Sequence, residues 1–104
     1  MGNLYEKEFD EKLGEATELV YAALQWTDAD VVKLCGAIAT GKLVKLEKLL
    51  LYDNPIGDAG VAALTEVAGK LPRLNTLDLS HNPNISQQAK DALRAALPDC
   101  DVYI

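Results

Sequence analysis

The 104-residue sequence contains few of the residues from which most catalytic and metal centres are built, with one histidine and two cysteines. These are too few for a disulfide framework or a zinc site of the usual Cys/His type. No apolar run approaches the roughly 20 residues of a membrane-spanning helix, and the N-terminus MGNLYEKEFDEK lacks the apolar core of a signal peptide. These absences favour a cytoplasmic protein with reduced thiols and with no metal or cofactor.

Basic residues are also scarce, since 10 Lys and Arg stand against 16 Asp and Glu, a net charge of −6. An acidic chain without a basic stripe repels phosphate groups. Neither nucleic acid nor an anionic membrane is therefore expected as a partner. With 49% hydrophobic and 25% charged residues, the chain has the composition of an ordinary folded domain.

A pattern of leucines closed by an asparagine occurs twice. Leu46, Leu49, Leu51 and Asn54 recur 28 residues later as Leu74, Leu77, Leu79 and Asn82. This L-x-x-L-x-L-x-x-N pattern resembles the leucine-rich-repeat family, and its period and helix-forming second half are similar to the ribonuclease-inhibitor subtype. The resemblance implies an α/β solenoid, with a short parallel sheet, helices on its convex side and a protein partner.

Two weaker copies flank this pair. Upstream, Leu19, Tyr21 and Trp26 align with Leu49, Leu51 and Ile56, and Leu24 stands where the asparagine would be. At the other end, Cys100, Val102 and Ile104 take the places of Leu74, Leu77 and Leu79. The chain is therefore expected to form one domain, 1–104, with repeats 16–45, 46–73 and 74–104, the last ending in a terminal strand.

Residues 1–15 precede the repeats, and Tyr5, Phe9 and Leu13 fall on one helical face. We expect them to form an N-terminal capping helix that covers the first repeat.

Each repeat predicts one strand followed by one helix. The strands are expected near 19–21, 49–51, 77–79 and 102–104, all parallel, and the helices at 28–40, 58–69 and 86–97. Apolar stripes along these helices would face the sheet. Gly41 and Gly69 are expected to adopt the left-handed conformation that ends a helix.

The most specific polar residues are Asn54 and Asn82. In leucine-rich repeats such an asparagine turns inward and bonds backbone groups of neighbouring turns, so the resemblance implies a structural asparagine ladder. Leu24 cannot make these bonds, and the first turn must be closed in another way. His81 is expected to be a surface residue near a strand end, and Cys35 and Cys100 to be small buried hydrophobes. We expect no catalytic residue.

Strand residues between the core leucines are expected on the concave face of the sheet. Stacked, the copies give three rows, namely Glu18, Lys48, Thr76 and Asp101; Val20, Leu50, Asp78 and Tyr103; and Ala22, Tyr52 and Ser80. Of these, the candidate partner-binding residues are Val20, Ala22, Lys48, Leu50, Tyr52, Thr76, Asp78, Ser80 and Tyr103. Clustered solvent-facing apolar groups are typical of interaction surfaces, although strands also favour such residues for their own sake.

The leading hypothesis is thus a non-catalytic module that binds another protein through this face. The alternative is a self-assembly module, a homodimer or a fragment of a longer solenoid, that pairs through the C-terminal edge strand near 102–104. An enzyme is the third reading, but no catalytic motif supports it.

Overall fold

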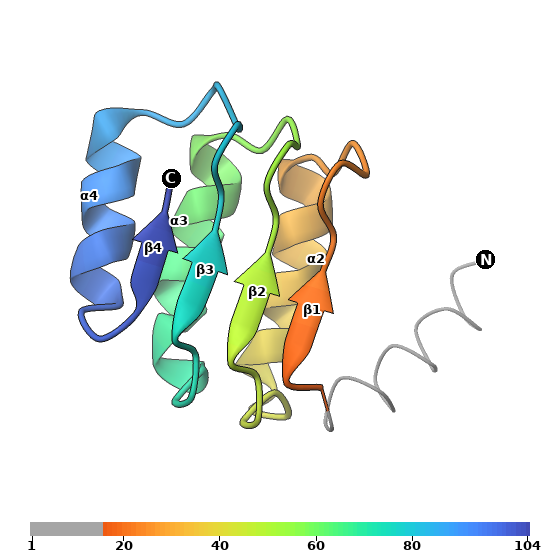
Figure 1. Ribbon diagram of the computed structural model, residues 1–104, viewed down its shortest axis with the longest axis vertical. Coiled ribbons are helices and arrows are strands. Elements are labelled where there is room, and N and C mark those ends of the chain that lie inside the picture. Colours follow the sequence, from red (N-terminus) through yellow and green to blue (C-terminus); the bar gives the residue numbers. More distant parts are fainter. Residues whose placement is uncertain (1–15) are drawn as a thin grey trace.

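The computed structural model describes residues 16–104. The expected capping helix at 1–15 lies outside the described residues. Strands and helices alternate along the chain, as Figure 1 shows. The elements are β1 (Glu18–Val20), α2 (Asp28–Ala39), β2 (Lys48–Leu50), α3 (Asp58–Val67), the 3-10 helix η1 (Ala68–Lys70), β3 (Thr76–Asp78), α4 (Gln87–Ala96) and β4 (Asp101–Tyr103). No helix in this part of the chain is long and apolar enough to cross a membrane.

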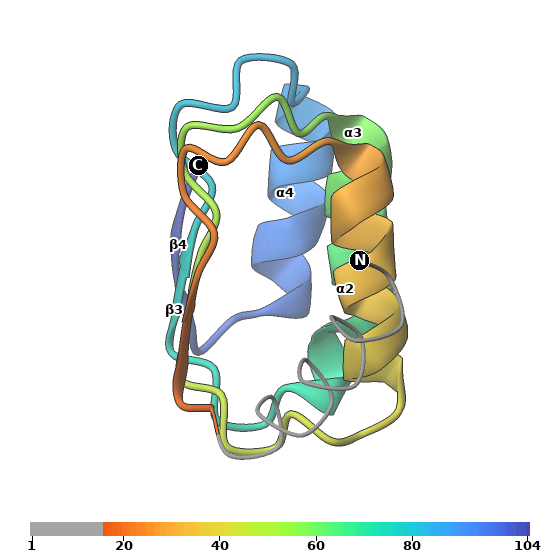
Figure 2. The same ribbon diagram turned by 90° about the vertical axis from the view of Figure 1, so that its right-hand side faces the viewer.

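The strands form one parallel four-stranded sheet in the order β1-β2-β3-β4. The helices of residues 16–104 lie on the same side of this sheet, which gives two layers (Figure 2). The expected parallel arrangement is confirmed, but each strand begins and ends one residue earlier than predicted. The backbone ladder nevertheless continues past the assigned ends, since the N–H of Leu51 donates to the carbonyl of Asp78.

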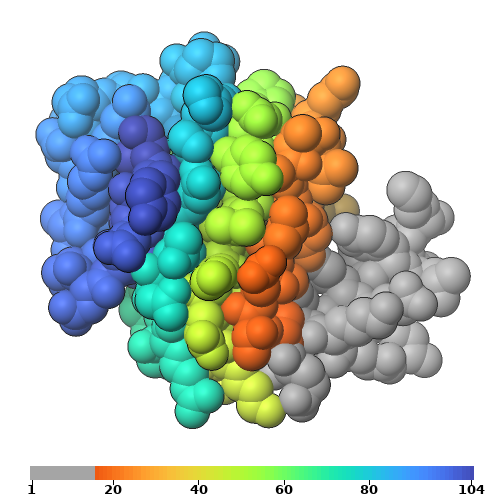
Figure 3. All heavy atoms as spheres, viewed as in Figure 1, coloured from red at the N-terminus to blue at the C-terminus, as the bar shows by residue number. Residues whose placement is uncertain are grey.

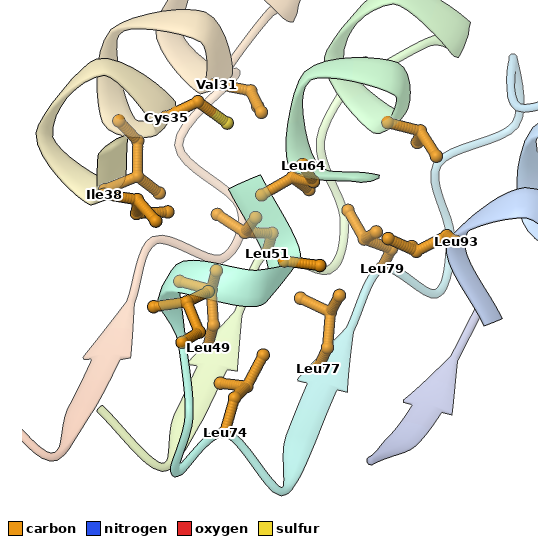
Figure 4. Close-up of a cluster of buried hydrophobic side chains, with 14 of the residues drawn as sticks. Val31, Cys35, Ile38, Leu49, Leu51, Leu64, Leu74, Leu77, Leu79 and Leu93 are labelled. Carbon is orange, nitrogen blue, oxygen red and sulfur yellow. The ribbon is translucent and has the colours of Figure 1, made fainter. Parts of the chain in front are cut away.

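The core fills the space between the two layers (Figure 4). Leu49, Leu51, Leu77 and Leu79 project from the strands and are at most 1% exposed. They meet buried residues of the helix stripes, among them Val31, Leu34, Ile38, Val61, Leu64 and Leu93. Full burial of such a side chain contributes roughly 1.5–3 kcal/mol. The leucine spacing and the helical stripes therefore encode one shared core.

The helices begin and end close to the predicted residues. Ser86 caps α4 by accepting a hydrogen bond from the N–H of Ala89, and Gly41 has the expected positive φ of 79°. The prediction for Gly69 is wrong, because it lies inside η1. There the chain tightens into a 3-10 turn, and the N–H of Leu71 bonds to the carbonyl of Ala68, so no left-handed residue is required.

The expected burial of Asn54 and Asn82 and their bonds to backbone groups are confirmed. Asn54 and Asn82 are 3% and 6% exposed. The amide of Asn82 donates to the carbonyls of Leu79 and Ser80 in its own turn and of Leu51 in the preceding one. Its Oδ1 accepts from the N–H of Ile56 at 3.1 Å. One side chain therefore joins two successive turns.

The turn that lacks an asparagine is closed by the next repeat. Asn54 Oδ1 accepts from the N–H groups of Leu24 and Trp26, both at 3.0 Å, and its amide donates to the carbonyl of Tyr21. Leu24 itself projects outward and is 55% exposed. The ladder thus needs an asparagine only on the later turn of each pair.

A second set of bonds joins successive repeats at the loops that precede the helices. Asp28 Oδ1 accepts from the N–H groups of Gly57 and Gly60, and Asp58 Oδ1 accepts from the N–H of Ser86 at 2.7 Å. Gly60 permits this approach, because a β-carbon there would lie 2.7 Å from Asp28 Oδ1 and 2.9 Å from Ile56 Cγ2. Each aspartate therefore ties its repeat to the next helix.

Replacing Asn54 by Ala should lower the free energy of unfolding by about 1–3 kcal/mol, because buried N–H and carbonyl groups lose their partners. Denaturant unfolding measures the loss. The matched control is Asn84→Ala, since Asn84 is exposed, and its effect should stay within about 0.5 kcal/mol. Equal midpoints for the two variants would contradict the ladder's role in stability.

Acid should weaken the bond made by Asp58. The backbone N–H of Ser86 and, with a smaller effect, its hydroxyl donate hydrogen bonds to this carboxyl. They hold its pKa below the ordinary value of 3.8. A lowered pKa means that the contribution is complete above pH 3.8 and is lost as the pH falls through the folded value. Asp58→Asn should therefore be less stable than the wild type at pH 7, and thermal melts should show the gap closing in more acidic buffer. A gap that persisted unchanged at pH 2 would exclude this linkage.

Candidate protein-interaction surface

The sheet side opposite the helices is uncovered by the rest of residues 16–104 (Figures 2 and 3). We call it the open sheet face, and it consists of Glu18, Val20, Ala22, Lys48, Leu50, Tyr52, Thr76, Asp78, Ser80, Asp101 and Tyr103. Because strand residues alternate, these side chains point away from the core leucines. The register brings the candidates Val20, Lys48, Leu50, Thr76, Asp78 and Tyr103 together on this face, and Ala22, Tyr52 and Ser80 follow two residues after the ends of their strands.

The strand register sets these residues in rows. Glu18, Lys48, Thr76 and Asp101 are successive pairing partners, and so are Val20, Leu50, Asp78 and Tyr103. The third row is aligned by backbone bonds, from the N–H of Ala23 to the carbonyl of Tyr52 and from the N–H of Asp53 to the carbonyl of Ser80. The predicted three-row arrangement matches the structure.

Apolar side chains gather on the β1 and β2 part of this face. Val20 is 50% exposed, and Ala22, Leu50 and Tyr52 are half-buried. Tyr103, on β4, is 54% exposed. These groups are accessible without unfolding, which is the property that a docking surface needs.

Polar groups on the same face are partly pre-arranged. Asp78 Oδ1 accepts hydrogen bonds from both the N–H and the hydroxyl of Ser80. Thr76 donates its hydroxyl to Asn75 Oδ1, and Glu18, Lys48 and Asp101 are exposed. Hydrogen bonding limits the rotation of Asp78, so its carboxylate is held on the sheet.

The strands end in turns with a left-handed residue, which the sequence analysis missed. Ala23, Asp53 and His81 occupy equivalent positions in the first three turns, with φ of 55°, 59° and 60°. In two of these turns the sequence could have indicated the left-handed residue, because Asp53 and His81 each directly precede a ladder asparagine. His81 is exposed at the end of β3, as expected.

The thiols are placed for packing. Burial and, to a smaller extent, the negative charge of Glu66 raise the pKa of Cys35 to about 11. Burial also raises the pKa of Cys100. A thiol with a raised pKa is a weak nucleophile at neutral pH. Cys35 is buried as expected, whereas Cys100 is only half-buried, because β4 has a neighbouring strand on one side among the described residues.

Trp26 packs against the core but remains half-buried. Its ring stacks on Tyr21, with centroids 4.4 Å apart and planes 14° from parallel. The packing role expected for Trp26 is confirmed. Within residues 16–104 no group of three or more His, Cys, Asp and Glu side chains is arranged to hold a metal ion.

Comparisons with known proteins find the fold but no family. No family model and no curated protein matches the sequence. Among solved structures, the fold is similar to that of leiomodin-1 actin-binding site 2, with a TM-score of 0.75 and 15% identity over 99% of this chain. The chain spans 63% of that protein's length. The similarity establishes a shared small α/β fold in which a parallel sheet alternates with helices.

Adjacent residues of β4 should differ sharply in their effect on stability. Val102 pairs with Leu77 and packs against the core, whereas Tyr103 is exposed on the open sheet face. We expect Val102→Ala to cost about 1 kcal/mol and Tyr103→Ala to stay within about 0.5 kcal/mol. Urea unfolding of the two variants measures this difference, and a larger loss for Tyr103→Ala would show that the faces of β4 are reversed.

Proposed function

We propose that the chain is a leucine-rich-repeat module that binds another protein through the open sheet face and catalyses no reaction. The observation that supports it is the apolar group formed by Val20, Leu50 and Tyr52 on the β1 and β2 part of a face that the helices do not cover, with the exposed ring of Tyr103 on β4 of the same face. The repeated leucine and asparagine pattern supports the family, and the buried amides of Asn54 and Asn82 fit it.

Three further features support a binding role. The open sheet face is built on parallel strands with fixed register, so the backbone positions from which its side chains project are set without a partner. Preorganisation of this kind lowers the entropic cost of association. In addition, a similar fold in leiomodin-1 contains an actin-binding site, which favours a protein as the class of ligand. The net charge of −6 favours partners without phosphate. We also propose a cytoplasmic location, because two cysteines are too few for a disulfide framework.

The proposal is tested by affinity capture from the native lysate with the wild type and with the double variant Leu50→Glu/Tyr52→Ala. Captured proteins are quantified by mass spectrometry. We expect at least one specific partner to be reduced about tenfold or more with the double variant, because a buried carboxylate is costly in an apolar contact.

The matched control is Val32→Glu, which introduces the same charge at a 51% exposed position on α2. It should capture the same partners as the wild type, and thermal melts should show all three proteins folded. Loss of capture with Val32→Glu but not with the double variant would place binding on the helices and overturn the proposal.

Self-assembly through β4 is a second candidate. Within residues 16–104, β4 pairs with β3 on one edge only. Val102 and Ile104 are half-buried, whereas the equivalent Leu77 and Leu79 are 1% exposed. An edge strand with unpaired backbone groups and incompletely covered apolar side chains can pair with a second copy.

Solution mass as a function of concentration distinguishes the two candidates. A concentration-dependent dimer that is weakened, together with overall stability, by deletion of residues 101–104 would favour self-assembly. A stable monomer at all concentrations would favour a free open sheet face.

A further inference from the structure

The open sheet face is chemically uneven from one side to the other. On β1 and β2 the single base, Lys48, lies beside Glu18 in the register, and the neighbouring row places Val20 beside Leu50. On β3 and β4 the outward residues include Asp78 and Asp101 and no base. One half of the face is therefore apolar with balanced charge, and the other half is acidic.

Asp78 is the best-placed of these acids. Both donors of Ser80 bond to Oδ1, and Oδ2 has no bonding partner within residues 16–104. Asp78 is half-buried between Leu50 and Tyr103, its partners on the adjacent strands. The carboxylate is thus fixed in direction and keeps one oxygen ready to accept a donor.

Tyr103 supplies the second element. Its side chain is 54% exposed beside Asp78 in the same row. A carboxylate next to an aromatic ring is a favourable site for a guanidinium or ammonium group, which bonds to the oxygen and lies against the ring. Neither β3 nor β4 contains a lysine or arginine that could occupy this site between Asp78 and Tyr103.

We infer, as a refinement that depends on the proposed function, that the partner presents a lysine or arginine to Asp78 and Tyr103 and an apolar side chain to Val20 and Leu50. Adjacent strands lie about 4.8 Å apart, so the two contacts are separated by about 10 Å. A partner of this chemistry is complementary to both halves of the face at once. The net charge of −6 further attracts a basic segment during encounter.

The test uses displayed random peptides of 12 residues, selected on the full chain. Enriched peptides are sequenced, and their affinities are measured for the wild type, Asp78→Asn, Leu50→Glu and the control Glu66→Gln. Glu66 is exposed on α3, away from the open sheet face. Thermal melts verify that each variant is folded.

We expect the enriched peptides to combine a basic and an apolar residue. Asp78→Asn should weaken their binding about tenfold, because a charge-assisted hydrogen bond is lost, and higher salt should weaken the wild-type affinity in the same direction. Glu66→Gln should leave the affinity unchanged.

Two failures are distinguishable. Peptides that lose affinity with Leu50→Glu but carry no basic residue, or are indifferent to Asp78→Asn, would overturn this inference and leave the proposed function intact. A selection that yields no peptide sensitive to Leu50→Glu would count against binding by the open sheet face, and the inference would fall with it.

Discussion

The buried side-chain amide of each ladder asparagine is the constraint on which the rest of the structure depends. Asn54 and Asn82 each satisfy backbone groups of two successive turns, and both are almost completely removed from solvent. Each polar group left unpaired in such a buried place would lower the free energy of unfolding. The turns that follow β1, β2 and β3 must therefore stack in register, and this stacking fixes the pairing of these three strands.

Fixed register makes the open sheet face a consequence of the core. Once Leu49 and Leu77 point inward, Leu50 and Asp78 must point outward, because neighbouring strand residues alternate. The outward residues contribute little to the shared core, so they can differ between repeats while the leucines stay the same. Lys48 and Thr76, or Leu50 and Asp78, illustrate this freedom at equivalent positions. The fold thus separates the residues that stabilise it from those available for recognition.

The periodic features were predictable, whereas the bonds that the aspartates make between repeats were not. Leucine spacing predicts the strand faces and the parallel order, because both depend only on which residues recur, and the resemblance to leucine-rich repeats implies the buried role of Asn54 and Asn82. The bonds from Asp28 to Gly57 and from Asp58 to Ser86 depend instead on which loops meet after the turns stack. The left-handed Ala23 and the 3-10 turn at Gly69 were likewise missed, since backbone closure overrides local preference there.

The burial of equivalent strand residues shows that neighbouring repeats cover one another's apolar side chains. Leu49 and Leu77, on the central strands, are 0% and 1% exposed, whereas Leu19 and Val102, on the outer strands, are only half-buried. A repeat cannot cover its own apolar face, so each strand is stabilised mainly by its neighbours. The second row of the open sheet face includes residues of both central and outer strands. Leu50 and Asp78 lie on the central strands, and Val20 and Tyr103 lie on the outer ones. A ligand that binds the folded chain at all of these residues would therefore contact central and outer strands together and raise the stability of the folded state.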